Sequence, residues 1–429
     1  MSVTLDLVPR ECARQAVNRS DGTSEGMAMP KHLVFILACL CLPPCLDLSA
    51  GEGWETFRGD VFRNGNADGS AIPTSFAVKW SHGVERFNSP SLDSSCAVVG
   101  GSVFIGMAER SVFSSGGVIL CVNAENGTAV WERKTRFPVF SSPAVAAGRV
   151  FVGEGYHQDS DCRLYCLDAK TGRDIWTFTA KSHVESSPHA TAERVTFGAG
   201  EDGIYCLNAV DGKIVWHHPK EHVDISPLVS SGFVFAGTGY GKTAAICLSA
   251  KDGKEVWRTE VDVPVWGSPV RVGTRLYLGL GNGSLIQSDP DPKGAVVCLA
   301  ASNGKKVWRR DLPDAVLTAV AFKKGTILAG CRDGKLYALK PSNGEIAWKC
   351  SLGGAAVVAS PLVGENEVAA ISDSGRLVVA SIGSGEILGS FDLSRIVTEE
   401  TVFISSPALW KGNIIVGSGN RLVCLQKKK

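Results

Sequence analysis

Two neighbouring segments of this sequence carry nearly the same polar side chains at the same spacing. His183 and Glu185 stand five and three residues before a proline, and His222 and Asp224 stand five and three residues before the next such proline. Two imidazoles and two carboxylates held together could bind a divalent metal ion, hold a cationic or sugar-like ligand, or transfer protons. Duplication of one repeat would also copy such a loop without any function, so the elements that position these side chains decide between the two hypotheses.

The two segments belong to a repeat of about 40 residues. A phrase that ends in tryptophan, CLDAKTGRDIW at Cys166–Trp176, recurs with a glycine four residues before each closing tryptophan. This period is typical of a four-stranded sheet with its turns. A seventh copy has Gly389 in place of the tryptophan, and the other copies close at Trp131, Trp176, Trp216, Trp257, Trp308 and Trp348.

A second landmark, Ser-Pro before a short apolar run, recurs in phase with the first. Between the landmarks lie short runs rich in Val, Ile, Phe and Tyr, separated by Gly, Asn and Asp, which predict four strands, A to D, in each unit. The landmark serines are Ser89, Ser142, Ser187, Ser226, Ser268, Ser360 and Ser406, with Ala319 at the eighth position.

The last unit stops at Lys429 before any strand D, and Phe76–Trp80 near the start supplies a strand with the missing tryptophan. Pairing of these two ends would close a ring and leave no long unpaired edge. The sequence therefore predicts an all-β fold: an eight-bladed β-propeller of four-stranded blades, closed by an N-terminal strand that completes the last blade. We expect it to form one domain over residues 52–429.

The repeated tryptophans have a structural explanation. A large flat ring near the outer strand can dock on the neighbouring blade, and the glycine before it permits a tight turn between strands C and D. We expect Gly389 to mark a weaker seam. We expect the blade-docking role for Trp80, Trp131, Trp176, Trp216, Trp257, Trp308 and Trp348.

With these repeats, the sequence resembles the quinoprotein-type, or pyrroloquinoline-quinone-like, eight-bladed propeller family over about Trp54–Leu425. The segments Trp54–Asp60 and Arg63–Gly65 resemble the opening of many exported members. The family includes quinone-dependent alcohol and sugar dehydrogenases, and also cofactor-free scaffolds such as the propeller lipoprotein of the outer-membrane β-barrel assembly machinery. The resemblance therefore implies the fold and leaves the activity open. The adjacent cysteine pair of the quinone-dependent alcohol dehydrogenases is missing here, which argues against that chemistry.

The start of the chain reads as an export signal. Lys31 and His32 precede ten apolar residues, which are too few to span a bilayer as a stable helix, and small residues follow at Ser49–Gly51. We expect residues 1–51 to be a leader whose true start is Met27 or Met29. The mature chain is then exported to the periplasm or the cell exterior, without a transmembrane helix, and membrane association through a lipid stays open.

Charge and cysteine content bear on two further questions, nucleic-acid binding and disulfide pairing. Lysine and arginine number 44 against 43 acidic residues, so no net field favours nucleic acid. Six of the 14 cysteines are not expected to pair with one another, because they occupy one repeated strand-C position, too far apart between blades for a disulfide. Pairing of Cys162 with Cys166, and pairs among Cys96, Cys331 and Cys350, stay open.

The loops between strands B and C and between strands D and A vary in length, whereas the turns on the other face are short and uniform. Variable loops on a rigid scaffold usually carry binding, so this variable-loop face is the expected working surface. Glu185 and Asp224 share one position on it, three residues before the landmark proline. The other blades hold Phe87, Phe140, Trp266, Leu317, Val358 and Ile404 at that position.

No catalytic motif accompanies this surface, and three functions stay open. The first is an exported, non-catalytic scaffold that binds a protein or peptide of the cell envelope and needs no cofactor. The second is a quinone-dependent periplasmic oxidoreductase of alcohols or sugars, in which Trp266 would stack on pyrroloquinoline quinone with Glu185 and Asp224 near a calcium ion. The third is carbohydrate binding, with Trp266, Phe87 and Phe140 as stacking platforms.

Overall fold

The computed structural model describes residues 54–59, 63–65, 70–85, 90–110, 115–219, 221–239, 241–397 and 401–429. They lie within the compact unit Ala50–Lys429. The expected leader and export signal, residues 1–51, lie outside the described residues. No helix among the described residues is both long and apolar enough to cross a membrane.

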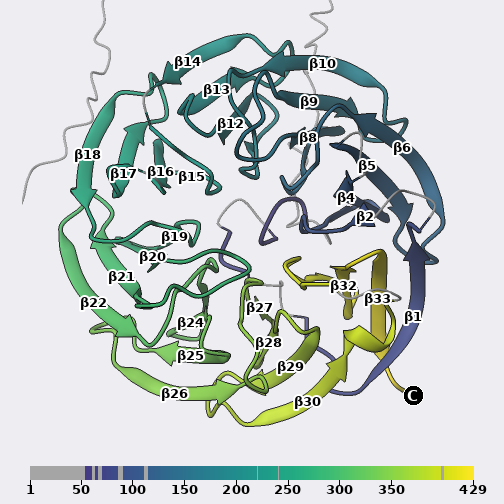
Figure 1. The fold of residues 1–429 in the computed structure, drawn as a ribbon, viewed down its shortest axis with the longest axis vertical. Coiled ribbons are helices and arrows are strands. Elements are labelled where there is room, and N and C mark those ends of the chain that lie inside the picture. Colours follow the sequence, from purple (N-terminus) through teal and green to yellow (C-terminus); the bar gives the residue numbers. More distant parts are fainter. Residues whose placement is uncertain are drawn as a thin grey trace, which may run out of the picture. The chain divides into compact units, whose positions relative to one another are not determined.

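Eight antiparallel sheets form a ring, which confirms the predicted eight-bladed propeller (Figure 1). Seven blades have four strands and the first has five. The first four blades consist of β2 Pro90–Ser91, β3 Ala97–Val99, β4 Ser102–Arg110, β5 Ser115–Asn123 and β6 Ala129–Thr135; β7 Ala144–Ala146, β8 Arg149–Gly153, β9 Arg163–Asp168 and β10 Asp174–Thr179; β11 His189–Ala190, β12 Arg194–Gly198, β13 Ile204–Asn208 and β14 Ile214–His218; and β15 Leu228–Ser230, β16 Phe233–Gly237, β17 Ala244–Ser249 and β18 Glu255–Glu260.

The remaining four blades complete the ring. One 3-10 turn, η1 Leu393–Arg395, follows β30 and is the single helical element among the described residues. These blades consist of β19 Val270–Val272, β20 Arg275–Gly281, β21 Gly294–Ala300 and β22 Lys306–Leu312; β23 Ala321–Lys323, β24 Thr326–Cys331, β25 Lys335–Leu339 and β26 Ile346–Ser351; β27 Leu362–Val363, β28 Glu367–Ile371, β29 Arg376–Ser381 and β30 Ile387–Asp392; and β31 Ala408–Trp410, β32 Asn413–Ser418 and β33 Arg421–Lys427 with β1 Phe76–Gly83.

The ring closes where the two ends of the chain share a blade. Strand β1 pairs antiparallel with β33, so the N-terminal strand is strand D of the last blade, as predicted. In this pair Trp80 lies opposite Cys424, the same register that places Trp176 opposite Cys166 in the second blade. The closure therefore reproduces an ordinary strand C to strand D pairing.

Each sheet is sandwiched between two others, which explains the apolar character of its middle strands. In β16 and β17 almost every residue is buried, whereas the outer strand β18 is partly exposed. Ten cysteines are described, all buried and none in a disulfide, so the pairings left open by the sequence do not form among them. These thiols fill the core as small apolar groups.

The tryptophans join each blade to the next. The indole Nε1 of each donates to a backbone carbonyl in the following blade at 2.8–3.1 Å. The ring also covers the glycine of that blade's turn between strands C and D. At Gly172, for example, φ is +69° and a Cβ would lie 2.5 Å from the indole of Trp131. Glycine is therefore needed at these turns both for the backbone conformation and for the close approach of the ring.

The seam at Gly389 is built differently. A Cβ at this glycine would lie 1.8 Å from the carbonyl oxygen of Thr74, so the backbone before β1 occupies the place where a side chain would stand. The following blade has no turn between strands C and D, because these strands come from opposite ends of the chain. A tryptophan at 389 would have no glycine turn to cover. Phe76 and Phe391 pack edge to face here instead, with ring centroids 5.9 Å apart.

The first described residues lie inside the ring (purple in Figure 1). The buried Arg58 guanidinium donates to the carbonyls of Val320 and Pro361, both at 2.7 Å, and so links blades six and seven. The buried Arg63 donates to the carbonyl of Ser187 at 3.0 Å, on the opposite side of the ring. Trp54 exchanges two 2.7 Å backbone hydrogen bonds with Val98 of blade one. This opening segment therefore ties the inner strands of several blades together across the channel.

Candidate functional site

A ring of hydroxyl groups lines the channel where the landmark serines lie. The backbone N–H of each ring residue donates to the serine Oγ of the next blade at 2.9–3.2 Å, and the chain of bonds breaks only at Ala319, which has no hydroxyl. The ring consists of Ser95, Ser142, Ser187, Ser226, Ser268, Ala319, Ser360 and Ser406.

The position predicted for blade one was wrong. Ser95 occupies the ring, whereas Ser89 and Phe87 lie outside the described residues and Pro90 forms an additional strand, β2, ahead of strand A. The reason is that Cys96 replaces the proline of the landmark, so the motif is hidden in this blade. As a consequence Asp93 takes the place that the sequence assigned to Phe87.

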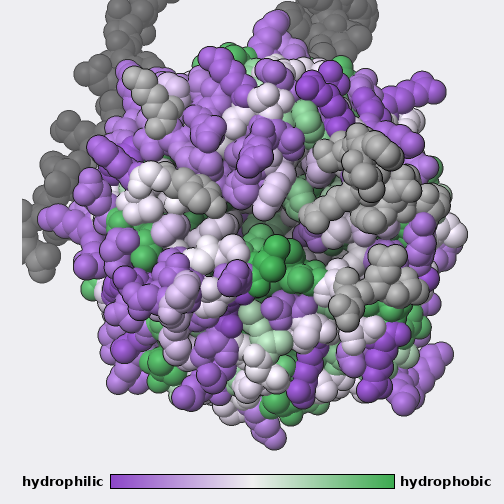
Figure 2. All heavy atoms as spheres, in the orientation of Figure 1, coloured by the Kyte–Doolittle hydropathy of each residue, from purple (hydrophilic) through white to green (hydrophobic). Residues whose placement is uncertain are grey.

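The side chains two residues before the ring positions line a cavity of about 350 Å³ at the channel mouth. Blades one, three and four contribute carboxyl groups, and the other five contribute apolar side chains. No lysine or arginine lines the cavity among the described residues. On the face seen in Figure 2, hydrophobic side chains gather near the centre of the ring inside a largely hydrophilic surround. The eight lining positions are Asp93, Phe140, Glu185, Asp224, Trp266, Leu317, Val358 and Ile404.

The backbone around the two His-containing loops explains why their side chains meet. Val184, between His183 and Glu185, is fully buried and donates its N–H to the carbonyl of Glu154 at the end of strand B in the previous blade. Val223, between His222 and Asp224, does the same to Gly200 at 3.0 Å. The repeat thus fixes both loops on adjacent blades by the same contact.

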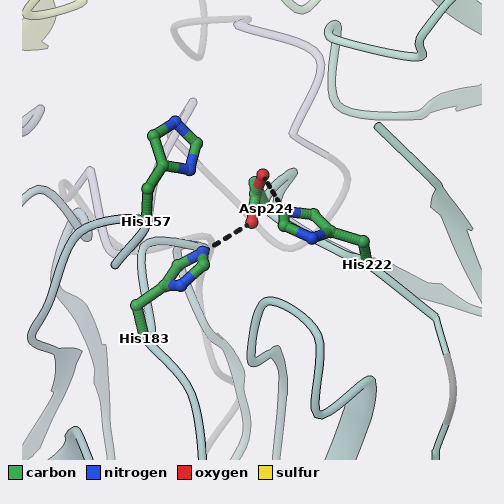
Figure 3. A group of neighbouring side chains, drawn as sticks. All are labelled: His157, His183, His222 and Asp224. Carbon is green, nitrogen blue, oxygen red and sulfur yellow. Dashed lines mark hydrogen bonds and ion pairs between the residues drawn. The ribbon is translucent and has the colours of Figure 1, made fainter. Parts of the chain in front are cut away.

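The carboxylate of Asp224 lies between two imidazoles (Figure 3). His183 Nε2 donates to Oδ1 at 2.9 Å and His222 Nε2 donates to Oδ2 at 2.7 Å. Burial favours the protonated carboxyl, but these two hydrogen bonds prevail and hold the pKa of Asp224 below its ordinary value. Burial acts in the opposite sense on His222, whose pKa is nevertheless raised by its bond to Asp224. The two hydrogen bonds from the imidazoles therefore favour an ionised Asp224 at neutral pH.

His157 completes this group and was missed by the sequence reasoning. It lies between β8 and β9, and its ring meets that of His183 edge to face, with centroids 5.6 Å apart. Burial lowers the pKa of His157, which favours the neutral imidazole. The length of the loop between strands B and C of blade two indicated a binding region. Its histidine has no counterpart in the other blades, so the comparison of repeats did not single it out.

Glu185 does not join the histidines as the sequence suggested. Its carboxylate accepts the backbone N–H of His157 at 3.3 Å and faces the cavity. Burial and the neighbouring Asp224 raise the pKa of Glu185 to about 8. Three of the four candidate polar residues therefore come together with His157, while Glu185 presents a mostly protonated carboxyl to the channel at neutral pH.

Trp266 lies across the cavity on the apolar side. It packs with Leu285 and Ile404 against the hydrophobic cluster that includes Leu317 and Val358. Its buried indole Nε1 has no hydrogen-bond acceptor among the described residues. A ligand in the cavity would thus meet an apolar wall on this side.

Pyrroloquinoline quinone does not fit these residues. The cofactor carries three carboxylates, and the cavity wall supplies three carboxyl groups of its own and no basic side chain among the described residues. Asp224 is moreover already engaged by two imidazoles. The ionised Asp224 would repel the carboxylates of the cofactor in this partly buried site, and no basic side chain among the described residues would offset that repulsion, so an anionic cofactor would be disfavoured here.

Comparisons with known proteins agree with the fold. The family model described as outer membrane protein assembly factor BamB matches residues 73–161, 117–246 and 222–429. The crystal structure of BamB from Moraxella catarrhalis is 15% identical, with a TM-score of 0.63, and the match covers 82% of this chain and 98% of that one.

Two dehydrogenase structures are similar to the same degree. Quinohemoprotein alcohol dehydrogenase from Comamonas testosteroni is 14% identical, with a TM-score of 0.64 over 88% of this chain and 81% of that one. A europium-containing methanol dehydrogenase is 11% identical, with a TM-score of 0.63 over 87% and 98%. No curated protein sequence matches. At these identities the structural likeness shows the fold alone.

Proposed function

This chain belongs to the family of outer membrane protein assembly factor BamB, and from that premise we propose that it is an exported, non-catalytic propeller that binds a polypeptide segment at its channel mouth. The ring of hydrogen-bonded blades makes a rigid scaffold, and the variable loops surround the cavity on one face. Such a surface suits recognition of a protein partner of the cell envelope without a cofactor.

The observation that carries the proposal is the two-sided lining of the cavity. Asp93, Glu185 and Asp224 lie on one side, and the apolar side with Trp266 lies on the other. A peptide that presents an apolar side chain next to a lysine or arginine would match both sides, because the apolar group is removed from water while its cationic neighbour meets the carboxyl groups. We therefore expect a preference for basic, apolar segments.

The oxidoreductase alternative has weaker support. Its cofactor would place further carboxylates against an acidic wall, and the similarity to the dehydrogenases is one of fold. Dye reduction on alcohols or sugars after addition of pyrroloquinoline quinone and calcium would favour it over the scaffold.

The test is fluorescence anisotropy with labelled decapeptides and the full chain. One peptide carries phenylalanine beside two lysines, a second carries phenylalanine beside two glutamates, and a third carries serine beside two lysines. We expect the first to bind at least about tenfold more tightly than the others, a difference of about 1.4 kcal/mol. Equal binding of all three, or none, would contradict the proposal.

Substitutions of residues that line the cavity test whether the peptide binds there. Asp93→Asn and Trp266→Leu should each weaken the first peptide, and Asp252→Asn, on an exposed turn of blade four, is the matched control. Export is tested separately by N-terminal sequencing of the mature chain from the cell-envelope fraction.

A further inference from the structure

His157, His183, His222 and Asp224 form a group whose ligand atoms converge on one point. One nitrogen from each imidazole and one carboxylate oxygen all lie within 4.8 Å of one another (Figure 3). Four ligands at about 2.0–2.1 Å from a tetrahedral zinc ion would be separated by roughly 3.3 Å. The hydrogen-bonded pairs, at 2.7 and 2.9 Å, are slightly closer than this, so small side-chain rotations would create the site.

The donor set selects a class of metal. Three imidazoles and one carboxylate suit zinc and its transition-metal neighbours, whereas calcium and magnesium require mostly oxygen ligands. We propose that these four residues bind one divalent transition-metal ion, with zinc as the expected occupant, at the edge of the channel mouth.

The polar groups behind the ligands support this assignment. Ser182 Oγ lies 3.1 Å from His183 Nδ1, within hydrogen-bond distance, whereas Glu201 Oε1 lies 3.9 Å from His222 Nδ1, close enough for an ion pair but not for a hydrogen bond. Metal-bound histidines usually have such a partner on the second ring nitrogen, which directs the first nitrogen to the ion. Both Nε2 atoms here face Asp224, as that arrangement requires.

The position of His183 is tightly restricted. Its side chain is fully buried, and a Cβ at Gly200 would lie 2.5 Å from the imidazole ring. Gly200 also accepts the N–H of Val223, so it holds both His183 and the loop that carries His222 and Asp224. This preorganised geometry lowers the cost of ordering the ligands around an ion. The half-buried His157 lies on the cavity side, from which an ion would enter.

A second group of potential metal ligands is already paired with a protein cation. His218, Glu221 and Glu255 also approach one another, but the guanidinium of Arg258 forms ion pairs with both carboxylates. A cation already neutralises that group, so it is not expected to bind a metal. It serves as the internal control.

The metal would join three loops that belong to different blades. His157 lies in a loop of blade two, His183 between blades two and three, and His222 with Asp224 between blades three and four. Zinc would therefore stiffen part of the variable-loop face and stabilise the folded chain. This inference does not rest on peptide binding, since the metal alone is the probe.

The experiment is a titration of the untagged, metal-stripped full chain with cobalt and then zinc. Cobalt is followed by its visible ligand-field absorption, and zinc by competition with a chromophoric chelator. We expect one equivalent of tightly bound metal, tetrahedral cobalt bands, and a rise in Tm on addition of zinc. Calcium should neither bind nor displace the zinc.

Variants decide whether these residues hold the ion. His157→Ala and His183→Ala should each weaken binding at least about tenfold, and His218→Ala should leave it unchanged. His157→Ala is the safer of the two for folding, because His157 is half-buried on a loop. The proposal is overturned if the wild-type chain binds no cobalt or zinc at micromolar concentration, or if both variants bind as tightly as wild type, which would place the metal elsewhere.

Discussion

The backbone N–H of Ser406 donates to the Oγ of Ser95 at 2.9 Å, although 311 residues separate the two along the chain. This bond joins the last blade to the first at the channel wall. It is the same contact that links successive blades around the ring. The propeller is therefore closed at its centre as well as by β1 at its outer edge.

The serine ring leads to a prediction about its one gap. Ser360→Ala removes the Oγ that accepts the N–H of Ala319, leaving that donor buried without this partner. We expect a loss of about 1–3 kcal/mol in unfolding free energy. Ala319→Ser supplies the missing hydroxyl opposite Ser268 and should gain up to about 1 kcal/mol. Urea unfolding compares the two variants, and equal midpoints would show that the ring does not contribute to stability.

Arg58 should be important for joining the inner strands. Arg58→Ala leaves the carbonyls of Val320 and Pro361 without their charged donor in a buried site. We expect a loss of about 3 kcal/mol. Arg58→Lys should be intermediate, because one ammonium lacks the planar fork that reaches both carbonyls. Chemical denaturation measures the loss, with the exposed Arg173→Ala as control, and a control-sized effect for Arg58→Ala would argue against this role.

Gly389 offers a test of the contact between blades seven and eight. Restoring the repeat with Gly389→Trp should destabilise the protein, because even a Cβ would meet the carbonyl of Thr74 at 1.8 Å. Gly389→Ala should cost about 1–3 kcal/mol for the same reason. Gly383→Ala, in the same blade, should be near neutral, because the added carbon would have one described atom within 4 Å, the Ser381 Oγ at 3.8 Å. Differential scanning calorimetry compares the Tm of the three variants with that of wild type, and a higher Tm for Gly389→Trp would refute this account.

Glu185 predicts a pH dependence of stability. Its pKa is raised to about 8 by burial and by Asp224, whereas the unfolded chain ionises near its ordinary value. The unfolded state therefore releases a proton that the folded state keeps, and stability falls as pH rises from about 4.5 through about 8. Glu185→Gln removes this loss, so we expect a gain on the order of 1 kcal/mol at pH 8, reduced by solvent screening of a half-buried group.

Unfolding midpoints between pH 5 and pH 8 check this expectation. The gain of Glu185→Gln over wild type should shrink steadily from pH 8 toward pH 5, because the unfolded wild type keeps more of its proton as the pH approaches the ordinary pKa of glutamate. Glu193→Gln, at an exposed position, is the matched control. A constant difference across the range would mean that Glu185 does not titrate as described.

The sequence by itself determined the architecture of this protein. The closing tryptophan with a glycine four residues before it recurs in six of the eight blades, and the paired apolar strands recur in all of them, because each blade must pack against two neighbours in the same way. The same repetition predicted that His183 and His222 would lie on adjacent blades. It also predicted β1 as the strand missing from the last blade.

Only the tertiary structure decided how the site is composed. Cys96 replaces the landmark proline of blade one. The place of Asp93 in the cavity wall could therefore be recognised only from the structure, where the hydrogen bond between Ser95 and Ser142 identifies the ring position of this blade. His157 lies in a loop with no repeated counterpart, and its approach to His183 depends on the path of that loop over the ring. Repeated patterns record contacts between equivalent positions, whereas a ligand site is built from the positions at which the blades differ.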